Sequence, residues 1–548
     1  MLPNRDPHQD DERRAVTRRT LLRGLAASAA IGASATSVTA TETTESDAFT
    51  RTQRVDIESF DGTTIAASLY EPTAEGPHPA ILITHGWGAD RNAAYVRRWA
   101  ENYASNGYVV LTYDSRGFGE SGGEVGVDGP KEVEDASTLV SWLAAHDAVQ
   151  TVEGEPDNPR VGMDGLSYGG GIQLNVAAAD DRLDAIVPRW AWHDLRYALE
   201  PNEVVKVGWA ALLYAAGVGG SRGLTSGDGL PDEDDAEYGL PPKLHEINTK
   251  AAATNEIDES GEAYLGVRSP AVKLDQLDTP ALFLQGWPDT LFVPNAALWT
   301  AQALESNDVP TRLVFFEGGH TATDAAGEDQ QQRLDAMALS WLDAFLKAPA
   351  QADQTARAAD AKLAPVTYYE VQTGEWREAE DVPKPDAETQ TRRFRDTSDG
   401  DSTVVLNSVI PTATSHFVPE NEDTAGTAVD FDFPIEQAQE IFGAPTARLT
   451  IEPLGPETRL FVRVKHVRDG EETLINNQVT PVRVEGLEPT EIDLELVAFQ
   501  RTFEPGDTLR MTIATTDAGF FASRESAGAR IHHTAERPST VEFPTVYW

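Results

Sequence analysis

The feature that most constrains the fold of this chain is a serine at a predicted strand-to-helix turn. Ser167 lies in Gly165-Leu-Ser-Tyr-Gly-Gly170, after a run at 160–164 that predicts a strand and before a run at 171–179 that predicts a helix. Small residues two positions before and after the serine allow a turn so sharp that a Cβ would clash there. Such a turn lifts the hydroxyl above the end of a sheet, so Ser167 is a candidate nucleophile.

The partners of a nucleophilic serine follow in the order that this arrangement requires. Asp289 stands just after an apolar run at 281–285, and His320 stands just after another at 311–316. A neutral imidazole takes the proton of the serine, and a carboxylate on its far nitrogen fixes the tautomer and stabilises the imidazolium. We therefore predict a catalytic triad of Ser167, Asp289 and His320.

Other residues offer weaker versions of the same chemistry. Ser121 and Ser221 also stand in Gly-x-Ser-x-Gly, but neither has a strand before it and a helix after it. Asp275 and Asp278 precede the strand at 281–285 and so fall at the wrong end of the sheet. His193-Asp194 follows the wrong strand for a base.

The order of apolar runs predicts the fold class. Strands at 79–84, 108–113 and 184–188 alternate with helices such as 93–106 and 133–145. This alternation is typical of an α/β domain, with a mostly parallel sheet and helices on both faces. It spans 53–347 and is interrupted at about 195–273, which we interpret as a cap inserted over the site.

The C-terminal third follows a different pattern. A segment rich in Ala, Gln and Asp at 348–362 reads as a linker. From 363 to 548 short alternating strands, among them one at 366–371, are separated by Gly, Pro and Asp turns. This part predicts an all-β sandwich or jelly roll.

The composition limits the partners of the chain. Its 548 residues hold 89 acidic against 44 basic side chains, a formal charge of -45. Such an acidic surface argues against nucleic acid and anionic membranes, and resembles that of proteins that work in concentrated salt, where repulsion between carboxylates is screened. The chain has no cysteine, which excludes disulfides and cysteine-ligated zinc. No histidines or acids have metal-ligand spacing, and we expect neither metal nor cofactor.

The N-terminus resembles a twin-arginine export signal. A basic region ends in Thr17-Arg-Arg-Thr-Leu-Leu22, a mildly apolar run follows at 24–38, and Val38-Thr-Ala40 resembles a cleavage site. The apolar run is too short and too polar for stable membrane insertion. We expect a signal at 1–40, a linker at 41–52, recognition by the twin-arginine export machinery, and an extracellular or cell-surface protein.

Taken together, these motifs resemble those of one family. The Gly-Leu-Ser167-Tyr-Gly-Gly turn, Gly-Trp-Pro-Asp289, Gly-Gly-His320, the Asp114-Ser-Arg-Gly loop, the cap and the C-terminal jelly roll are similar to the CocE/NonD hydrolases and the X-Pro dipeptidyl peptidases of serine peptidase family S15. The resemblance covers roughly 53–548 and implies an α/β-hydrolase fold with Ser167 as nucleophile, His320 as general base and Asp289 as the acid that orients it.

The same resemblance suggests how the rest of the site is built. It implies an oxyanion hole that uses the backbone N–H of Tyr168, and we take the N–H of Trp87 as the second donor. Some relatives supply a tyrosine hydroxyl instead, but the loop here reads His85-Gly-Trp87-Gly. Trp190, Trp192 and Trp287 are candidates for walls of a substrate pocket, or for core packing beneath the cap.

The sequence leaves the substrate open. We favour an exported esterase or amidase that forms an acyl-serine intermediate on a small-molecule ester or amide, because little chain separates the signal from the first strand, as in the shorter members of the family. The alternative is an X-Pro dipeptidyl peptidase acting on peptides. A surface binding protein without catalysis is a third interpretation, which the complete triad disfavours. The oligomeric state is not predicted.

Overall fold

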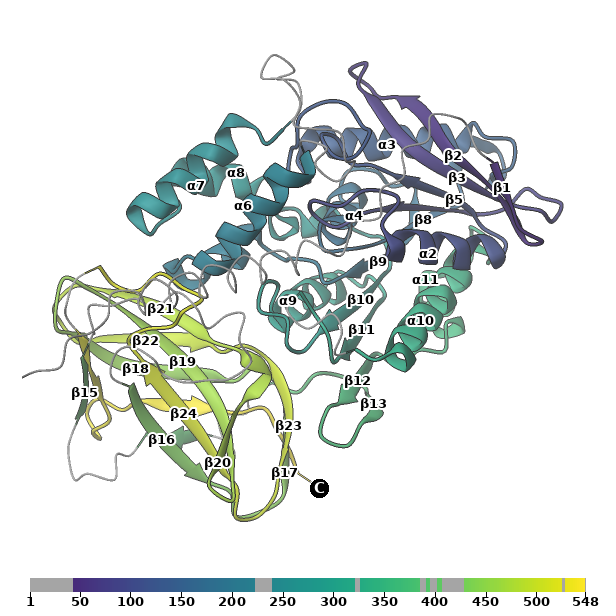
Figure 1. The fold of residues 1–548 in the computed structure, drawn as a ribbon. Coiled ribbons are helices and arrows are strands. Elements are labelled where there is room, and N and C mark those ends of the chain that lie inside the picture. Colours follow the sequence, from purple (N-terminus) through teal and green to yellow (C-terminus); the bar gives the residue numbers. More distant parts are fainter. Residues whose placement is uncertain are drawn as a thin grey trace, which may run out of the picture.

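The computed structural model describes residues 43–221, 239–320, 326–384, 391–394, 402–406, 428–524 and 528–547. An α/β lobe and an all-β lobe lie side by side, with the cap helices beside the α/β lobe (Figure 1). The predicted export signal at 1–40 lies outside these residues. Within the described part of the chain, no helix combines the length and apolar character needed to cross a bilayer.

The α/β lobe is built on an eleven-stranded sheet in the order β1-β2-β3-β5-β4-β8-β9-β10-β11-β12-β13. Neighbouring strands from β5 to β12 pair in parallel, and the strands at both edges pair antiparallel. The strands are β1 (Thr43–Glu45), β2 (Phe49–Glu58), β3 (Thr64–Pro72), β4 (Ala80–Thr84), β5 (Val109–Tyr113), β8 (Val161–Leu166), β9 (Leu183–Arg189), β10 (Ala281–Gly286), β11 (Thr311–Phe316), β12 (Val366–Glu370) and β13 (Glu375–Ala379). A short hairpin of β6 (Thr151–Val152) and β7 (Glu155–Pro159) lies outside this sheet.

Helices cover both faces of the sheet, which confirms the predicted α/β-hydrolase class (Figure 1). The apolar stripes of α3 (Pro130–Ala144), α4 (Tyr168–Ala177) and α9 (Pro294–Glu305) pack into one core. Those of α2 (Ala94–Ser105), α10 (Glu328–Leu346) and α11 (Gln354–Asp360) pack into the core on the other face. The central strands β4 and β5 are buried throughout, because they are covered from both sides.

Three predicted boundaries differ from the structure. The segment 41–52, expected as a linker, contains β1 and the start of β2. The expected linker 348–362 contains α11, which packs on the α/β core. The strand predicted at 366–371 for the sandwich is β12, which pairs in parallel with β11. Alternation along a strand shows which face is buried but not which sheet it joins, so this error has a physical basis.

The described parts of the segment 195–273, residues 195–221 and 239–273, form helices where the cap was predicted. They contain α5 (Leu195–Leu199), η1 (Pro201–Glu203), α6 (Val207–Ser221), α7 (Pro242–Thr254), α8 (Glu259–Gly266) and η3 (Pro270–Val272), and η4 (Leu274–Gln276) follows them. The apolar side chains of the cap share a core with Phe118, Tyr168 and Trp192 of the α/β lobe. The cap is therefore packed onto the lobe around the end of β8.

The β lobe is a sandwich of antiparallel sheets, as predicted. Its larger sheets follow the orders β14-β26-β18-β25-β15, with β22 beside β18, and β16-β24-β19-β20, with β21 beside β19; a smaller sheet is β23-β17-β27. Apolar side chains from these sheets form one core. The strands are β14 (Thr391–Arg393), β15 (Ser402–Leu406), β16 (Ala428–Pro434), β17 (Gln439–Gly443), β18 (Thr446–Pro453), β19 (Glu457–Arg468), β20 (Glu471–Leu474), β21 (Thr480–Glu485), β22 (Thr490–Glu495), β23 (Phe499–Phe503), β24 (Thr508–Ala514), β25 (Gly528–His532), β26 (Thr540–Glu542) and β27 (Thr545–Tyr547), with η6 (Ile475–Asn477) between β20 and β21.

Candidate active site

The turn between β8 and α4 has the strained geometry that its glycines predict. Ser167 adopts φ 57° and ψ -115°, in a region that residues with a side chain rarely enter. A Cβ on Gly165 would lie 2.6 Å from the carbonyl oxygen of Gly169, and a Cβ on Gly169 would lie 2.7 Å from that of Thr84. Only glycine fits at these two positions, so the strain at Ser167 is maintained by the packing around it.

The three residues of the predicted triad form one hydrogen-bonded chain. Nε2 of His320 lies 2.8 Å from Oγ of Ser167, and Nδ1 lies 2.7 Å from Oδ2 of Asp289. Asp289 is fully buried and Ser167 is 7% exposed. Because a buried carboxylate directs the Nδ1 proton toward itself, Nε2 is left to accept the serine proton.

Main-chain amides fix the orientation of the carboxylate. Oδ1 of Asp289 accepts hydrogen bonds from the N–H groups of Leu291 and Phe292, at 2.9 and 3.0 Å. This loop, from Asp289 to Phe292, is called the acid loop below. Its two amides satisfy one carboxylate oxygen and leave the other to His320.

Side chains from the cap and the β lobe also hold the acid loop. Nζ of Lys206 donates to the carbonyls of Thr290 and Leu291. The indole of Trp209 donates to the Thr290 hydroxyl. Gln478 of the β lobe donates to the carbonyl of Asp289. Sequence reasoning missed these three donors, since no local motif marks them and their partners lie far away along the chain.

Aromatic rings surround the imidazole of His320. Ring centroids of Phe292, Trp209 and Trp190 lie 4.9, 5.9 and 6.3 Å from it. They come from the acid loop, from α6 and from the end of β9. Such a surrounding limits the access of water and strengthens the hydrogen bonds of the triad.

Two of the predicted pocket tryptophans lie close to the site. Trp190 has a positive φ of 50°, and its indole N–H has no acceptor among the residues described. Its ring stands beside His320, a position that suits a pocket wall. Trp192 is 3% exposed, and its indole donates to the carbonyl of Arg268 in the cap. Its ring packs on Phe292, so Trp192 supports the acid loop from beneath the cap.

Trp287 occupies a different place from the one predicted. Its ring is buried, stacks on Phe315 at 4.3 Å and meets Phe442 of the β lobe edge-on at 6.0 Å. These contacts place Trp287 in the core between the two lobes rather than on a pocket wall. A tryptophan just after a strand looks the same in sequence in either role, since its partner Phe442 lies far along the chain.

The predicted oxyanion residues lie next to each other. Tyr168 is the first residue of α4, so its N–H has no acceptor within the helix. The Trp87 ring packs on that of Tyr168 at 5.2 Å, and its indole donates to the carbonyl of Leu213. On the same loop the N–H of Gly86 donates to the Tyr95 hydroxyl. The side chains are thus used in packing, which suits donation by the main-chain N–H groups of Tyr168 and Trp87.

The phenol of Tyr168 is hydrogen-bonded to a buried carboxylate. It donates to Oε1 of Glu132 at 2.6 Å, and Glu132 also accepts from the amides of Gly126 and Gly129. Burial raises the pKa of Glu132 to about 7, although these hydrogen bonds favour its ionised form. The first turn of α4 is therefore anchored through the hydroxyl of Tyr168.

The weaker candidates have structural partners. The Ser121 hydroxyl donates to the carbonyl of Asp114, and that of Ser221 donates to Gly217 one turn earlier in α6. His193 is hydrogen-bonded to Thr300, while Asp194 pairs with Arg196. None of these groups joins the chain from Asp289 to Ser167.

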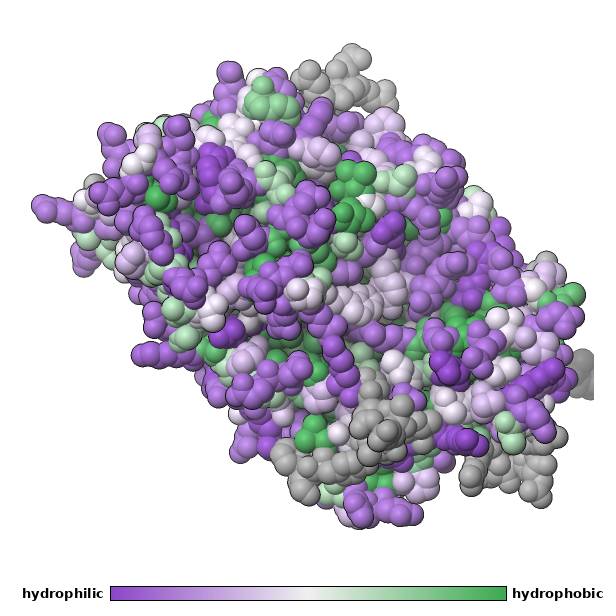
Figure 2. Space-filling model, turned by 180° about the vertical axis from the view of Figure 1, so that it is seen from behind, coloured by the Kyte–Doolittle hydropathy of each residue, from purple (hydrophilic) through white to green (hydrophobic). Residues whose placement is uncertain are grey.

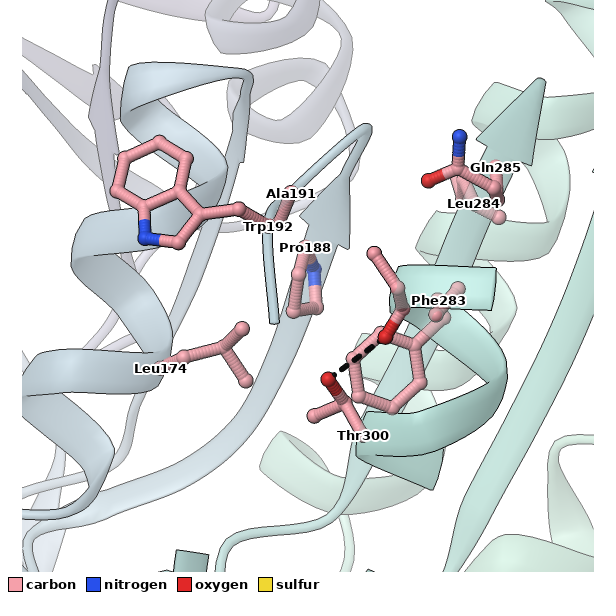
Figure 3. A pocket seen from close by; sticks show the side chains of 10 residues that line it. Leu174, Pro188, Ala191, Trp192, Phe283, Leu284, Gln285 and Thr300 are labelled. Carbon is pink, nitrogen blue, oxygen red and sulfur yellow. Dashed lines mark hydrogen bonds between the residues drawn. The ribbon is translucent and has the colours of Figure 1, made fainter. Parts of the chain in front are cut away.

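Below the site the packing is apolar. Figure 3 shows a small gap between β9, β10, α4 and α9, lined by side chains that include Leu174, Pro188, Trp192 and Phe283. The Thr300 hydroxyl at its edge donates to the carbonyl of Ala296. In the described ranges no group of three or more histidine, aspartate or glutamate side chains could hold a metal ion.

Comparison with known proteins places this geometry in a family. Residues 61–322 match the family of X-Pro dipeptidyl-peptidases (S15 family), and residues 359–542 match the X-Pro dipeptidyl-peptidase C-terminal non-catalytic domain. The chain belongs to this S15 family. Its catalytic lobe carries the hydrogen-bonded serine, histidine and aspartate described above.

Individual relatives agree with this assignment. Cocaine esterase of Rhodococcus sp. (strain MB1 Bresler) is 25% identical over 89% of the chain and 97% of its own length. Other curated relatives are 33 to 35% identical over only 130 or 131 residues, and the chain spans less than half of their length.

Solved structures share the fold of this chain along most of its length. A CocE/NonD family hydrolase from Staphylococcus aureus has a TM-score of 0.66 at 15% identity, with 91% of this chain and 94% of that chain covered. An aminopeptidase from a marine sediment Thaumarchaeota archaeon has a TM-score of 0.68 at 15% identity, with 93% and 99% covered. These likenesses extend over both lobes.

Proposed function

We propose that this S15 hydrolase is an exported, salt-adapted esterase or amidase that works through an acyl-Ser167 intermediate. The observation that carries the proposal is the unbroken chain from buried Asp289 through His320 to Ser167. Each group has the position that its role requires: a strained serine, an imidazole with one free accepting nitrogen, and an acid fixed by amides.

In the proposed acylation step, Oγ of Ser167 attacks the acyl carbonyl while Nε2 of His320 takes the serine proton. Asp289 stabilises the imidazolium that forms. The N–H groups of Tyr168 and Trp87 receive the developing oxyanion. His320 then gives its proton to the departing alcohol or amine, and water attacks the acyl-enzyme by the same route in reverse.

The esterase assignment is supported by what surrounds the imidazole. Among the residues that the structure describes, aromatic side chains surround His320, whereas recognition of the free α-amine of a peptide calls for a carboxylate near the acyl pocket. The buried carboxylate of Glu132 is already engaged by Tyr168 and two amides. The similarity to cocaine esterase along nearly the whole chain points in the same direction.

An X-Pro dipeptidyl peptidase is the second candidate. Both matched family descriptions name that activity. An acyl-serine intermediate serves ester and peptide bonds alike, so the distinction lies in how the substrate is bound.

One assay separates the two. Purified protein in molar salt near pH 8 is given a short-chain p-nitrophenyl ester and, separately, Gly-Pro-p-nitroanilide, with Ser167→Ala beside each. Ester turnover that Ser167→Ala removes, without anilide turnover, supports the esterase. Anilide turnover that is lost when the amine is blocked establishes the peptidase instead. Ser221→Ala is the control, because its hydroxyl only caps a turn of α6; full activity is expected.

Export and salt adaptation rest on the sequence. The twin-arginine motif in 1–40 supports transport of a folded protein to the cell surface or medium. The charge of -45 supports work at high ionic strength. Figure 2 shows a face dominated by hydrophilic residues, with smaller hydrophobic areas between them. Detection of the mature protein outside the cell, and its loss after Arg18→Lys and Arg19→Lys together, tests the export route.

A further inference from the structure

Lys206 is a buried lysine directly before the cap helix α6, and it lies against the acid loop. It precedes α6 by one residue and is only 2% exposed. Nζ donates to the carbonyl of Thr290 at 2.8 Å and to that of Leu291 at 2.9 Å. Burying an ammonium without an ion pair costs several kcal/mol, so a lysine in this position needs an explanation other than stability.

The acid loop needs both of these hydrogen bonds. Its amides at Leu291 and Phe292 point inward to Oδ1 of Asp289. The carbonyls of Thr290 and Leu291 therefore point away from the carboxylate, into a buried region where they would otherwise lack donors. Lys206 satisfies both at once, and so fixes the peptide planes whose N–H groups hold Asp289.

The charge of Lys206 acts on the same group. Asp289 is the charged residue whose field reaches the ammonium, and it opposes the effect of burial, which lowers the pKa of Lys206 to about 7. The Asp289 carboxylate thus lies in the field of the Lys206 ammonium and is also hydrogen-bonded to the imidazole of His320.

The position of Lys206 is itself fixed from the β lobe. The carbonyl of Val205, just before it, accepts from the N–H of Phe521, and the N–H of Gly208, two residues after it, donates to the carbonyl of Gly519. Its own N–H donates to Leu199 of the cap. Three separate segments thus meet at this lysine.

We propose that Lys206 is a positioning residue that holds the acid loop of the triad and couples it to the cap. The proposal rests on the catalytic roles assigned above to Asp289 and His320. It predicts that Lys206 acts on the rate of the chemical step and on its pH dependence, rather than on substrate binding.

The test is Lys206→Met, which keeps the length of the apolar stem and removes both the charge and the two hydrogen bonds. We expect kcat for the p-nitrophenyl ester to fall about tenfold or more, with KM changed less than about threefold. The pH dependence of kcat/KM should change near pH 7, where burial places the pKa of Lys206, because that titrating group is gone. A residue that only supports the fold would lower the amount of active protein and leave that profile in place.

Lys250→Met is the matched control. Lys250 belongs to α7 of the same cap, but its side chain is 44% exposed and pairs with Glu246 and Asp258, where ion pairs contribute little. We expect its kcat and pH profile to match those of the wild type. Active sites in every variant are counted with a fluorophosphonate that reacts with Ser167, so that kcat refers to folded enzyme.

The outcomes are distinct. Unchanged kcat and an unchanged pH profile in Lys206→Met overturn the proposal. If Lys206→Met yields no folded protein, Lys206→Gln decides, because it keeps one donor without the charge: an intermediate kcat with the changed profile supports the proposal, and wild-type values overturn it. Activity that survives in Ser167→Ala would refute the proposed function instead, independently of either lysine variant.

Discussion

The orientation of the His320 imidazole is fixed by the groups that are hydrogen-bonded to its two nitrogens. Asp289 holds Nδ1 at 2.7 Å and is itself oriented by two amides, so the ring has one tautomer and one orientation. Phe292, Trp209 and Trp190 close the sides. The base is therefore placed before any substrate arrives, which lowers the cost of reorganisation during the reaction.

Replacing the acid by its amide tests this arrangement. In Asp289→Asn, the side chain loses the charge that stabilises the imidazolium. The amide that replaces it also favours the wrong tautomer of His320. We expect kcat to fall on the order of 10⁴-fold, as when the acid of other triads is changed to asparagine. Asp278→Asn is the control, since Asp278 is exposed and stands before β10. Equal losses in the two variants would contradict the assignment.

The sequence predicted the residues that follow local rules. Ser167, Asp289 and His320 each follow a strand in a recognisable motif, and the structure joins them. Lys206 carried no such signal, and the Gly-Trp-Pro-Asp289 motif did not show where the ring of Trp287 lies. A lysine before a helix is usually exposed, and a tryptophan after a strand can line a pocket or lie in a core, so only the distant partners of these two residues show their roles.

At the scale of elements, α6 connects the two sides of the site. Its first turn holds the acid loop through Trp209. Farther along, the carbonyl of Leu213 accepts the indole N–H of Trp87, and Gly220 packs against Gly88. A Cβ on Gly220 would lie 2.6 Å from the Cα of Gly88. The glycines let the helix approach the loop that carries Trp87, the proposed second oxyanion donor.

A single methyl group on this face should move the helix. A Cβ on Gly217 would lie 2.5 Å from the ring of Trp87. We expect Gly217→Ala to lower kcat/KM about fivefold or more, because the Trp87 loop or α6 must shift. Gly219→Ala, on the open face of the same helix, should keep full activity and gain roughly 0.5–1 kcal/mol of stability. Assays and thermal unfolding on both variants check this; similar activity in the two would refute it.

Element boundaries were harder to predict than element types. The helix predicted at 93–106 and the strand predicted at 108–113 agree with α2 and β5 to within one residue at each end. The strand at 366–371 was assigned to the wrong sheet, because its alternating pattern suits a parallel edge of the α/β sheet and a sandwich strand equally well. Pairing between strands is a property of the tertiary fold.

At the scale of the whole molecule, the β lobe takes part in the site. Gln478, which is 7% exposed, donates to the carbonyls of Trp287 and Asp289. The β lobe therefore supports the acid loop from outside the α/β lobe. No local motif in the sequence had suggested this contact. Contacts between the lobes are also made by the buried ring of Trp287 on Phe442.

Removing the Gln478 amide tests the role of the β lobe. In Gln478→Leu both donated hydrogen bonds are lost, and we expect kcat to fall about threefold to tenfold with KM nearly unchanged. Gln372→Leu is the control, because Gln372 also bridges the lobes, through the main chain of Thr502, but is exposed. An equal effect of both variants would mean that lobe contacts act through stability alone.

The charge of the chain makes a prediction about salt. With 89 acidic and 44 basic side chains, repulsion is weak only where the Debye length is about 3 Å, as it is at about 1 M salt. We expect the midpoint of thermal unfolding to rise by roughly 10 °C or more between about 0.2 M and about 3 M KCl. Calorimetry or circular dichroism measures this. A midpoint independent of salt would remove the support for salt adaptation.

We expect the supports of the acid loop to decide when the chain becomes active during its synthesis. Gln478 and the Gly519–Phe521 segment beside Lys206 leave the ribosome long after Ser167, Asp289 and His320. A nascent chain thus carries the reactive serine for most of its translation without a fixed acid loop. We expect the growing or prematurely ended polypeptide to be a poor catalyst, so that hydrolytic activity marks a finished molecule and is withheld from fragments.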